Sequence, residues 1–355
     1  MRYVIVGAGA IGGVIGGRLA EHEAVHPPLL IARGEHGAAI KHGGLRVRSP
    51  ETDVVVHVPS ADGPDGVRLR ADDVLVFATK TQAVETALRQ WVDQPVYAQG
   101  DGEERPIGTA GELLPVFTAL NGVESERIAL RYFARVFGVC VWVPAVHLTP
   151  GEVVVRIAPS SGTFIVGRYG TAATEADREL LETLGTDWRA ATFRIFAVDD
   201  VMRWKHRKLL SNLGNALQAL LGPGADGADA LQKRLRTEAE GVYRAAGVTW
   251  PTDAEEKEWR ADAFQIRAVP GFEGSLGGSS WQSMQRGAGS VETDFLNGEI
   301  VLLARSLGLA APLNAVVQRL TRRAAGSGSA AASMTVDELA AALDAAEGSG
   351  AVVPR

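Results

Sequence analysis

The sequence of 355 residues predicts two domains, an α/β domain followed by an all-helical domain. In the first part, apolar β-branched runs that begin with Arg2–Val6 alternate with helical patterns, as is typical of buried parallel strands. From about Asp199 the character changes to long helical patterns. We therefore predict domains at residues 1–197 and 198–325, followed by a linker and a tail helix at 326–355.

A glycine-rich turn follows the first predicted strand directly and forms a complete G-x-G-x-x-G. Its first glycine allows a tight turn, its second lets a pyrophosphate approach the backbone, and its third lets the next helix pack on the strand. The free N–H groups of that helix then favour phosphate binding. This strand–turn–helix order predicts a Rossmann-type domain, with the cofactor held by Gly7, Ala8, Gly9, Ala10, Ile11 and Gly12.

The end of the second predicted strand, Pro28–Ala32, indicates which dinucleotide is bound. An NAD-selective site places an acidic residue here, about 20 positions beyond the glycines, whereas this chain has Arg33. An arginine can pair with a 2′-phosphate, so NADP(H) is favoured over NAD(H). NAD(H) stays open as the alternative, because Glu35 is nearby and Arg33 can also be an ordinary surface residue.

Composition and charge exclude several classes of function. The net charge of −6 gives no general reason to expect nucleic-acid or membrane binding. We see no targeting segment and expect a cytoplasmic protein whose single cysteine, Cys140, lies in the core. The motif His22-Glu23-Ala24-Val25-His26 matches a zinc pattern, but Pro27 follows it at once, so we predict a turn and no metal.

Polar side chains follow two further predicted strands. Asp73–Ala78 ends at Lys80, and Pro115–Leu120 ends at Asn121. Because ligands of open α/β sheets bind at the carboxyl ends of strands, we expect both side chains beside the cofactor crevice. The polar segment Gln94–Gly111 between these strands is predicted to be an inserted loop.

One predicted helix of the second domain, Val201–Leu221, carries an unusual polar stripe. Lys208, Asn212 and Asn215 lie 4 and 3 residues apart and therefore share one face, between leucines. This pattern favours a partly buried polar pocket. A solvent-facing stripe is the alternative, since Lys205 and Arg207 indicate that the helix also meets water.

Further helices are predicted after this one. They are Ala230–Ala246, a helix capped by Thr252-x-x-Glu255, Ser279–Arg286, Val291–Leu307 with Leu296, Ile300, Leu303 and Leu307 inward, and Pro312–Arg323. A flexible linker at Gly326–Ser329 precedes a tail helix that begins near Thr335 and that we expect to be dispensable for chemistry. Ser279-Ser280 and Glu292 form a second polar group, although Glu292 equally suits a helix N-terminus.

Short motifs follow one another in the order GAGAIGG, LLIARGEH, TK, NG, RKLLSN, SS and VETDFLNG. This order resembles the ketopantoate reductase (2-dehydropantoate 2-reductase) family over roughly Met1–Arg323. The resemblance implies a Rossmann domain, a helical domain, and reduction of a 2-oxo acid with NADPH. It implies catalytic roles for Lys208 and Glu292, substrate or cofactor contacts for Lys80, Asn121, Asn212 and Ser280, and a cofactor contact for Glu292. Asn215 is predicted to contact the substrate from its place on the polar stripe, although it lies one residue before the family's second asparagine.

Some positions depart from the family pattern on the substrate side. The asparagine usual eight residues after the lysine is Ala216, the asparagine usual before the serines is Gly277, and the usual methionine is Trp281. The substrate is therefore ketopantoate, a bulkier oxo acid or an imine, and a non-catalytic NADP(H)-binding redox sensor is a third interpretation. The predicted partner is a small 2-oxo acid, and a homodimer stays open.

Overall fold

The computed structural model describes residues 1–22, 26–98, 105–260, 265–272, 277–287 and 289–349. These residues form two compact units. The first unit contains Met1–Leu120, Glu124–Trp204 and Thr252–Glu273, and the second contains Asn121–Val123, Lys205–Pro251 and Gly274–Arg355. The chain therefore passes between the units several times, and the boundary between residues 197 and 198 stays a prediction.

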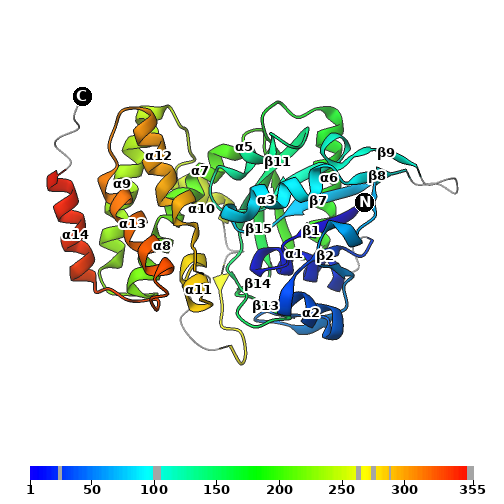
Figure 1. Cartoon of the computed structure of the whole chain (residues 1–355), viewed down its shortest axis with the longest axis horizontal. Helices are drawn as coiled ribbons and strands as arrows, with labels where there is room; N and C mark the ends of the chain where they lie inside the picture. The colour runs from blue at the N-terminus through cyan, green and yellow to red at the C-terminus, as the bar shows by residue number, and fades with distance from the viewer. Residues whose placement is uncertain (23–25, 99–104, 261–264, 273–276, 288, 350–355) are drawn as a thin grey trace. The chain divides into compact units, whose positions relative to one another are not determined.

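A twisted main sheet forms the centre of the first unit, with strand order β16-β15-β11-β10-β7-β1-β2-β5 (Figure 1). All neighbouring strands pair in parallel except β11 and β15, which are antiparallel. The strands are β1 (Arg2–Val6), β2 (Leu29–Ile31), β5 (Ser60–Ala61), β7 (Asp73–Phe77), β10 (Pro115–Thr118), β11 (Arg135–Trp142), β15 (Gly162–Arg168) and β16 (Phe193–Ala197).

Helices cover both faces of this sheet. Alternate residues of β1 point to opposite faces, so each set of residues packs in a different core. Tyr3 and Ile5 pack in one core with α1 (Ala10–Glu21) and α6 (Glu175–Ala190). Val4 and Val6 pack in the other with α3 (Thr81–Val92) and α5 (Ser125–Ala129). The predicted parallel α/β domain is thus confirmed.

Smaller sheets and helices complete this unit. They are β3 (Leu45–Arg48), β4 (Asp53–Val56), β12 (Ala145–Val146) and β13 (Glu152–Val155) in one sheet, β6 (Leu69–Arg70), β8 (Pro95–Tyr97) and β9 (Pro106–Thr109) in another, the pair β14 (Ile157–Ala158) and β17 (Gln265–Ile266), and the helices α2 (Gly34–Gly43), η1 (Pro64–Gly66), α4 (Ala110–Leu113) and α10 (Asp253–Arg260).

The prediction of an inserted loop at Gln94–Gly111 is wrong for the residues of this segment that the structure describes. β8 and β9 pair as an antiparallel hairpin, and β8 also pairs with β6. Val96 is fully buried on this hairpin and anchors it to the core beneath α3. Each of these strands has only three or four residues and begins with proline, so the pattern was too weak to predict a strand.

Helices alone make up the regular structure described in the second unit. They are α7 (Val201–Asn212, of which residues from Lys205 belong here), α8 (Gly214–Leu221), α9 (Ala228–Ala246), α11 (Ser279–Gln285), η2 (Glu292–Phe295), α12 (Asn297–Ser306), α13 (Pro312–Gly326) and α14 (Val336–Ser349). α13 contacts α8, α9, α12 and α14, and these helices lie side by side in Figure 1. The predicted all-helical second domain is confirmed.

Two predicted helices are interrupted. The single helix expected at Val201–Leu221 breaks at Leu213, whose carbonyl oxygen accepts a hydrogen bond from the Asn297 side chain. The helix expected at Val291–Leu307 begins as the 3₁₀ turn η2, and α12 starts only at Asn297. Leu307, predicted to point inward, is 42% exposed because the helix ends before it.

The tail after α13 is packed onto the helical unit. Leu339 and Leu343 of α14 are fully buried, and the Met334 N–H donates to the Leu220 carbonyl. The predicted capping box is confirmed, since the Thr335 N–H donates to the Glu338 carboxylate at 2.8 Å. The linker at Gly326–Ser329 therefore leads into an anchored helix.

The single cysteine and the hydropathy of the helices remain to be described. Cys140 is buried as predicted, and its thiol donates to the Trp204 carbonyl. Across the described part of the chain, every helix is too short or too polar to span a membrane.

Candidate active site

The glycine turn between β1 and α1 has the geometry that a bound pyrophosphate needs. Gly7 has φ +100°, a conformation that favours glycine. A Cβ at Gly12 would lie 2.1 Å from the Gly7 carbonyl oxygen, whereas a Cβ at Gly9 would meet nothing within 4 Å. Gly12 thus lets helix and turn approach each other, and Gly9 faces open space. Pyrophosphate binding at this turn stays a prediction.

A polar atom without a partner lies beside this turn. Thr79 follows β7, and its methyl group would be 3.0 Å from a Cβ at Gly7. Its hydroxyl is buried with no hydrogen-bond partner among the described residues. A buried hydroxyl normally has a partner, so this one is suited to a bound ligand. The residues present therefore fit a dinucleotide, and Thr79 is a candidate that the sequence analysis did not single out.

Arg33 and Lys80 stand at the ends of the two strands that flank β1. Arg33 is exposed, begins α2 as its N-cap, and makes no hydrogen bond or ion pair recorded among the described residues. Lys80 is half-buried and begins α3 as its N-cap. β1 pairs in parallel with both β2 and β7, so both residues follow carboxyl ends of neighbouring strands.

In the second unit, the predicted lysine and asparagine are in direct contact. The Lys208 Nζ on α7 donates to the Asn121 Oδ1 at 2.6 Å. The next residue, Gly122, has φ +77°, and a Cβ there would lie 2.9 Å from the Phe295 carbonyl of η2. The Asn121 segment therefore packs against the turn that carries Glu292. The amide oxygen accepts this hydrogen bond and so orients the ammonium group.

Two other predicted residues have buried polar atoms without partners. One is the Nδ2 of Asn212, a residue that lies one helical turn after Lys208. The other is the Oγ of Ser280 on α11, a residue that is only 1% exposed. Neither atom has a hydrogen-bond partner among the described residues. Leaving such a group unsatisfied costs about 1–3 kcal/mol. An amide donor and a hydroxyl in the unit that carries Lys208 suit a ligand with oxygen acceptors.

Glu292 and Asn215 complete the predicted set. Glu292 is 3% exposed at the first position of η2, so it is both a helix-start residue and a buried carboxylate. The Asn215 Nδ2 on α8 donates to the Ser279 Oγ at 3.5 Å. This weak bond connects α8 to α11 and places Asn215 as a support of the segment that carries Ser280.

One inference about α7 is wrong. Lys205 and Arg207 were expected to face water, but they are 3% and 5% exposed. The pattern of a single helix does not reveal which of its side chains the folded chain buries. The exposure expected for Lys205 and Arg207 was the argument for a solvent-facing stripe on α7, and this argument no longer holds.

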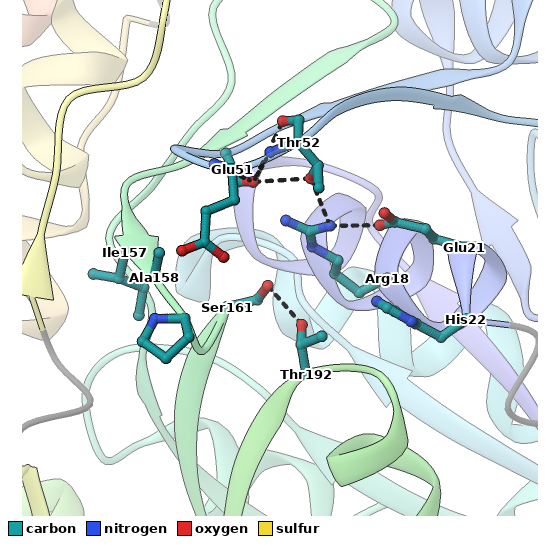
Figure 2. Close-up of a pocket in the computed structure, with 11 residues that line it drawn as sticks. Arg18, Glu21, His22, Glu51, Thr52, Ile157, Ala158, Ser161 and Thr192 are labelled. Carbon is teal, nitrogen blue, oxygen red and sulfur yellow. Dashed lines mark hydrogen bonds and ion pairs between the residues drawn. The ribbon is translucent and has the colours of Figure 1, made fainter.

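An open cavity of about 80 Å³ in the first unit contains none of the predicted site residues (Figure 2). Arg18, Glu21 and His22 contribute to it from the carboxyl end of α1. That end lies about 17 Å along the helix from the glycine turn. The Arg18 guanidinium is already paired with Glu21. The cavity therefore has no part in the site described here.

The zinc-like motif falls at the end of α1. The helix ends at Glu21 and His22 follows in a turn, as predicted, while residues 23–25 lie outside the described residues. Among the described residues, no group of three or more His, Cys, Asp or Glu side chains is placed to hold a metal ion.

Comparison with known proteins identifies the family. Residues 3–170 match the model of ketopantoate reductase PanE/ApbA, and residues 200–325 match the model of its C-terminal domain. The chain belongs to the ketopantoate reductase family. The predicted membership is thus confirmed, and members of this family are dinucleotide-dependent oxidoreductases.

Relatives in this family match along nearly their whole length. The 2-dehydropantoate 2-reductase of Pyrococcus horikoshii is 24% identical over 330 residues, which are 91% of this chain and 97% of that protein. The 2-dehydropantoate 2-reductase of Halobacterium salinarum is 27% identical over 338 residues, 92% of this chain and all of that protein.

Solved structures have the same fold. A PanE/ApbA family ketopantoate reductase from Ralstonia eutropha is 26% identical with a TM-score of 0.72, covering 92% of this chain and 99% of that one. D-mandelate dehydrogenase, solved with NADH and anilino(oxo)acetate, is 20% identical with a TM-score of 0.73 and the same coverage. The ketopantoate reductase fold is therefore also the fold of an enzyme with an aromatic ligand.

Proposed function

We propose that this protein reduces a 2-oxo acid to a 2-hydroxy acid with NADPH, and that ketopantoate is its first candidate substrate. The observation that carries the proposal is the contact between Lys208 and Asn121. In the same helical unit, the Asn212 amide nitrogen and the Ser280 hydroxyl have no hydrogen-bond partner among the described residues. The names of the curated relatives support ketopantoate. This activity belongs to pantothenate biosynthesis, which we place in the cytoplasm.

The cofactor is held by the first unit. Gly7, Gly9 and Gly12 shape the turn for the pyrophosphate, and the N–H groups at the start of α1 bind its oxygens. Arg33 pairs with the 2′-phosphate of NADPH, which makes NADP(H) the proposed cofactor. When bound, the nicotinamide supplies the hydride that reaches the 2-oxo carbon.

The residues of the helical unit then manage the proton. The Lys208 ammonium donates a hydrogen bond to the 2-oxo oxygen, stabilises its developing negative charge and transfers a proton to it. Asn121 keeps the ammonium oriented, at 2.6 Å. Asn212 and Ser280 bind the carboxylate, which satisfies their buried polar atoms. Glu292 holds the lysine and the new hydroxyl group.

A substrate panel tests the proposed reaction. Purified protein is mixed with NADPH and, in turn, ketopantoate, smaller aliphatic 2-oxo acids and phenyl-substituted 2-oxo acids, and the loss of nicotinamide absorbance is followed. Reduction of at least one acid is expected, with Lys208→Ala as the inactive control. Binding of NADPH without turnover of any 2-oxo acid in the panel contradicts the proposed reaction and favours the non-catalytic sensor.

A second candidate, a reductase of a bulkier 2-oxo acid, is favoured by one packing feature. A Cβ at Gly277 would lie 2.5 Å from the Cβ and Cγ of Trp281, so the indole occupies the space of a side chain at 277. The family usually has asparagine and methionine at these two positions. The exchange replaces a polar group near Ser280 with a flat apolar surface, which suits an apolar or aromatic substrate tail.

Paired variants distinguish the two substrates. Gly277→Asn combined with Trp281→Met recreates the usual pair, whereas Gly277→Asn alone clashes with the indole. If the bulky acid is the substrate, the double variant shifts kcat/KM from aromatic acids toward ketopantoate. If wild type already prefers ketopantoate and the double variant changes nothing, the bulky-substrate candidate is wrong.

A further inference from the structure

His36 joins three separate segments around the glycine turn. It lies on α2, three residues after Arg33. Its Nε2 is 2.8 Å from the carbonyl oxygen of Ala8, inside the turn. Its Nδ1 accepts a hydrogen bond of 2.9 Å from the Gly151 N–H, at the turn that precedes β13. One imidazole therefore connects α2, the glycine turn and the small sheet.

These two partners determine the protonation state of the ring. The Gly151 N–H is only a donor, so Nδ1 carries no proton, and the Ala8 carbonyl is only an acceptor, so Nε2 carries one. Burial lowers the pKa of His36 below its ordinary value of 6.5, and the bond to Ala8 opposes this in part. The His147 ring packs against the His36 ring, with centroids 4.1 Å apart and planes tilted by 49°. The neutral imidazole is thus held in one orientation.

The bond to Ala8 also orients the next N–H group. The peptide bond between Ala8 and Gly9 is trans, since it is not among the cis bonds of the chain. In a planar trans peptide the C=O and the N–H point in opposite directions. Holding the Ala8 carbonyl toward His36 therefore directs the Gly9 N–H away from His36. Gly9 is the glycine that faces open space at the start of α1.

We propose that His36 is a positioning residue for the cofactor pyrophosphate, which acts by fixing the Ala8–Gly9 peptide so that the Gly9 N–H is aimed at the bound phosphate oxygens. This inference rests on the proposed function, because it requires dinucleotide binding at the glycine turn. It assigns His36 no contact with substrate or cofactor.

Variants of two histidines on the same helix test it. His36→Ala removes both bonds, His36→Gln keeps one donor and one acceptor, and His36→Met fills similar volume without an N–H. His42→Ala is the matched control, because His42 is exposed on α2 and bonds only to its own helix at Ala38. Dissociation constants for NADPH and for ADP-ribose are measured by fluorescence or calorimetry, together with kcat, KM and Tm.

We expect His36→Ala to weaken both ligands about 10-fold, the effect typical of losing one or two hydrogen bonds. The KM for NADPH rises in parallel, while kcat at saturating cofactor changes less. His36→Gln regains most of the affinity, and His42→Ala equals wild type. His36→Met replaces His36→Ala if the alanine variant does not fold, and it is expected to bind as weakly.

Each alternative outcome has a distinct meaning. Wild type that binds no dinucleotide contradicts the proposed function itself. Wild type that binds normally, with His36→Ala and His36→Met equally tight, overturns the role of His36. A lowered Tm with unchanged affinity also overturns it, because His36 is then a purely structural residue.

Discussion

The Nζ of Lys208 donates a 2.6 Å hydrogen bond to the Oδ1 of Asn121, a residue that precedes it by 87 positions. This contact joins the segment that follows β10 to the first helix of the helical unit. It gives the Lys208 ammonium group a polar partner that fixes its orientation. Lys205, three residues earlier, is buried on the same helix but was not predicted to take part.

The first prediction concerns proton donation by Lys208. Lys208→Ala should lower kcat by about 10²–10⁴-fold, the effect typical of losing a positioned acid. NADPH affinity should stay close to wild type, because the glycine turn lies in the other unit. Lys208→Arg should also be nearly inactive, since a guanidinium keeps the charge but does not release its proton. Steady-state kinetics with fluorescence titration provide the measurement.

The control for this prediction is an exposed lysine of the helical unit. Lys233→Ala on α9 should retain full activity. Lys205→Ala is unsuitable as a mild control because its side chain is only 3% exposed. An active Lys208→Ala enzyme contradicts the assignment of the proton donor.

The second prediction concerns cofactor choice. Arg33 is exposed and has no recorded ion pair among the described residues, so its guanidinium is available to a 2′-phosphate. Arg33→Ala should weaken NADPH binding by about 1.5–3 kcal/mol and leave NADH binding nearly unchanged. Calorimetric titration with both cofactors measures the difference. Equal losses for NADPH and NADH contradict the selectivity for NADP(H).

The third prediction separates stability from binding at Ser280. Its hydroxyl is buried and has no partner among the described residues, so Ser280→Ala should leave Tm unchanged or slightly raised. The same change should raise the KM for the 2-oxo acid, because the substrate loses a hydrogen bond. Ser283→Ala is the control, since Ser283 bonds to the Ser279 carbonyl within its own helix. An unchanged KM for Ser280→Ala removes it from the substrate site.

The fourth prediction concerns the tail. Cutting the chain after Ala325 removes Leu339 and Leu343, each fully buried. Burial of one leucine contributes about 1.5–3 kcal/mol, so Leu343→Ala and the truncation should both lower Tm. Leu302→Ala, at a leucine that is 56% exposed on α12, should not. Folded truncated protein should keep kcat and KM, and its inactivity contradicts the expectation that the tail is dispensable for chemistry.

The fifth prediction is a pH dependence of stability due to His36. Its pKa in the folded protein is lowered by burial, so the unfolded chain binds a proton first as the pH falls below about 6.5. This histidine therefore reduces the free energy of unfolding from about pH 6.5 down to its lowered pKa. Urea unfolding at about pH 7.5 and about pH 5.5 should show a smaller loss for His36→Gln than for wild type.

Neighbouring charges define the control for this measurement. Glu35 precedes His36 on α2, the His147 ring packs against the His36 ring at a tilt, and Glu152 begins the strand after Gly151. These groups remain in His36→Gln, so the difference from wild type isolates the imidazole. His42→Ala should lose as much stability as wild type on acidification. An identical loss in His36→Gln shows that His36 does not contribute.

The sequence by itself determined the features that depend on neighbouring residues. The glycine spacing, the β-branched strand at Arg2–Val6 and the capping boxes at Thr252 and Thr335 act within one strand, turn or helix, and the structure contains them. The polar stripe of α7 was visible for the same reason, because helical periodicity relates residues three and four positions apart. The family motifs likewise pointed to the residues of the candidate site.

Only the tertiary structure decided which distant groups meet. It brought Asn121 to Lys208, placed His36 between Ala8 and Gly151, buried Lys205 and anchored the tail through Leu343. It also ended a helix at Leu213, where the Asn297 side chain binds the carbonyl. Such contacts join residues far apart in the chain, and their formation depends on how whole helices and sheets pack, which no local pattern of residues encodes.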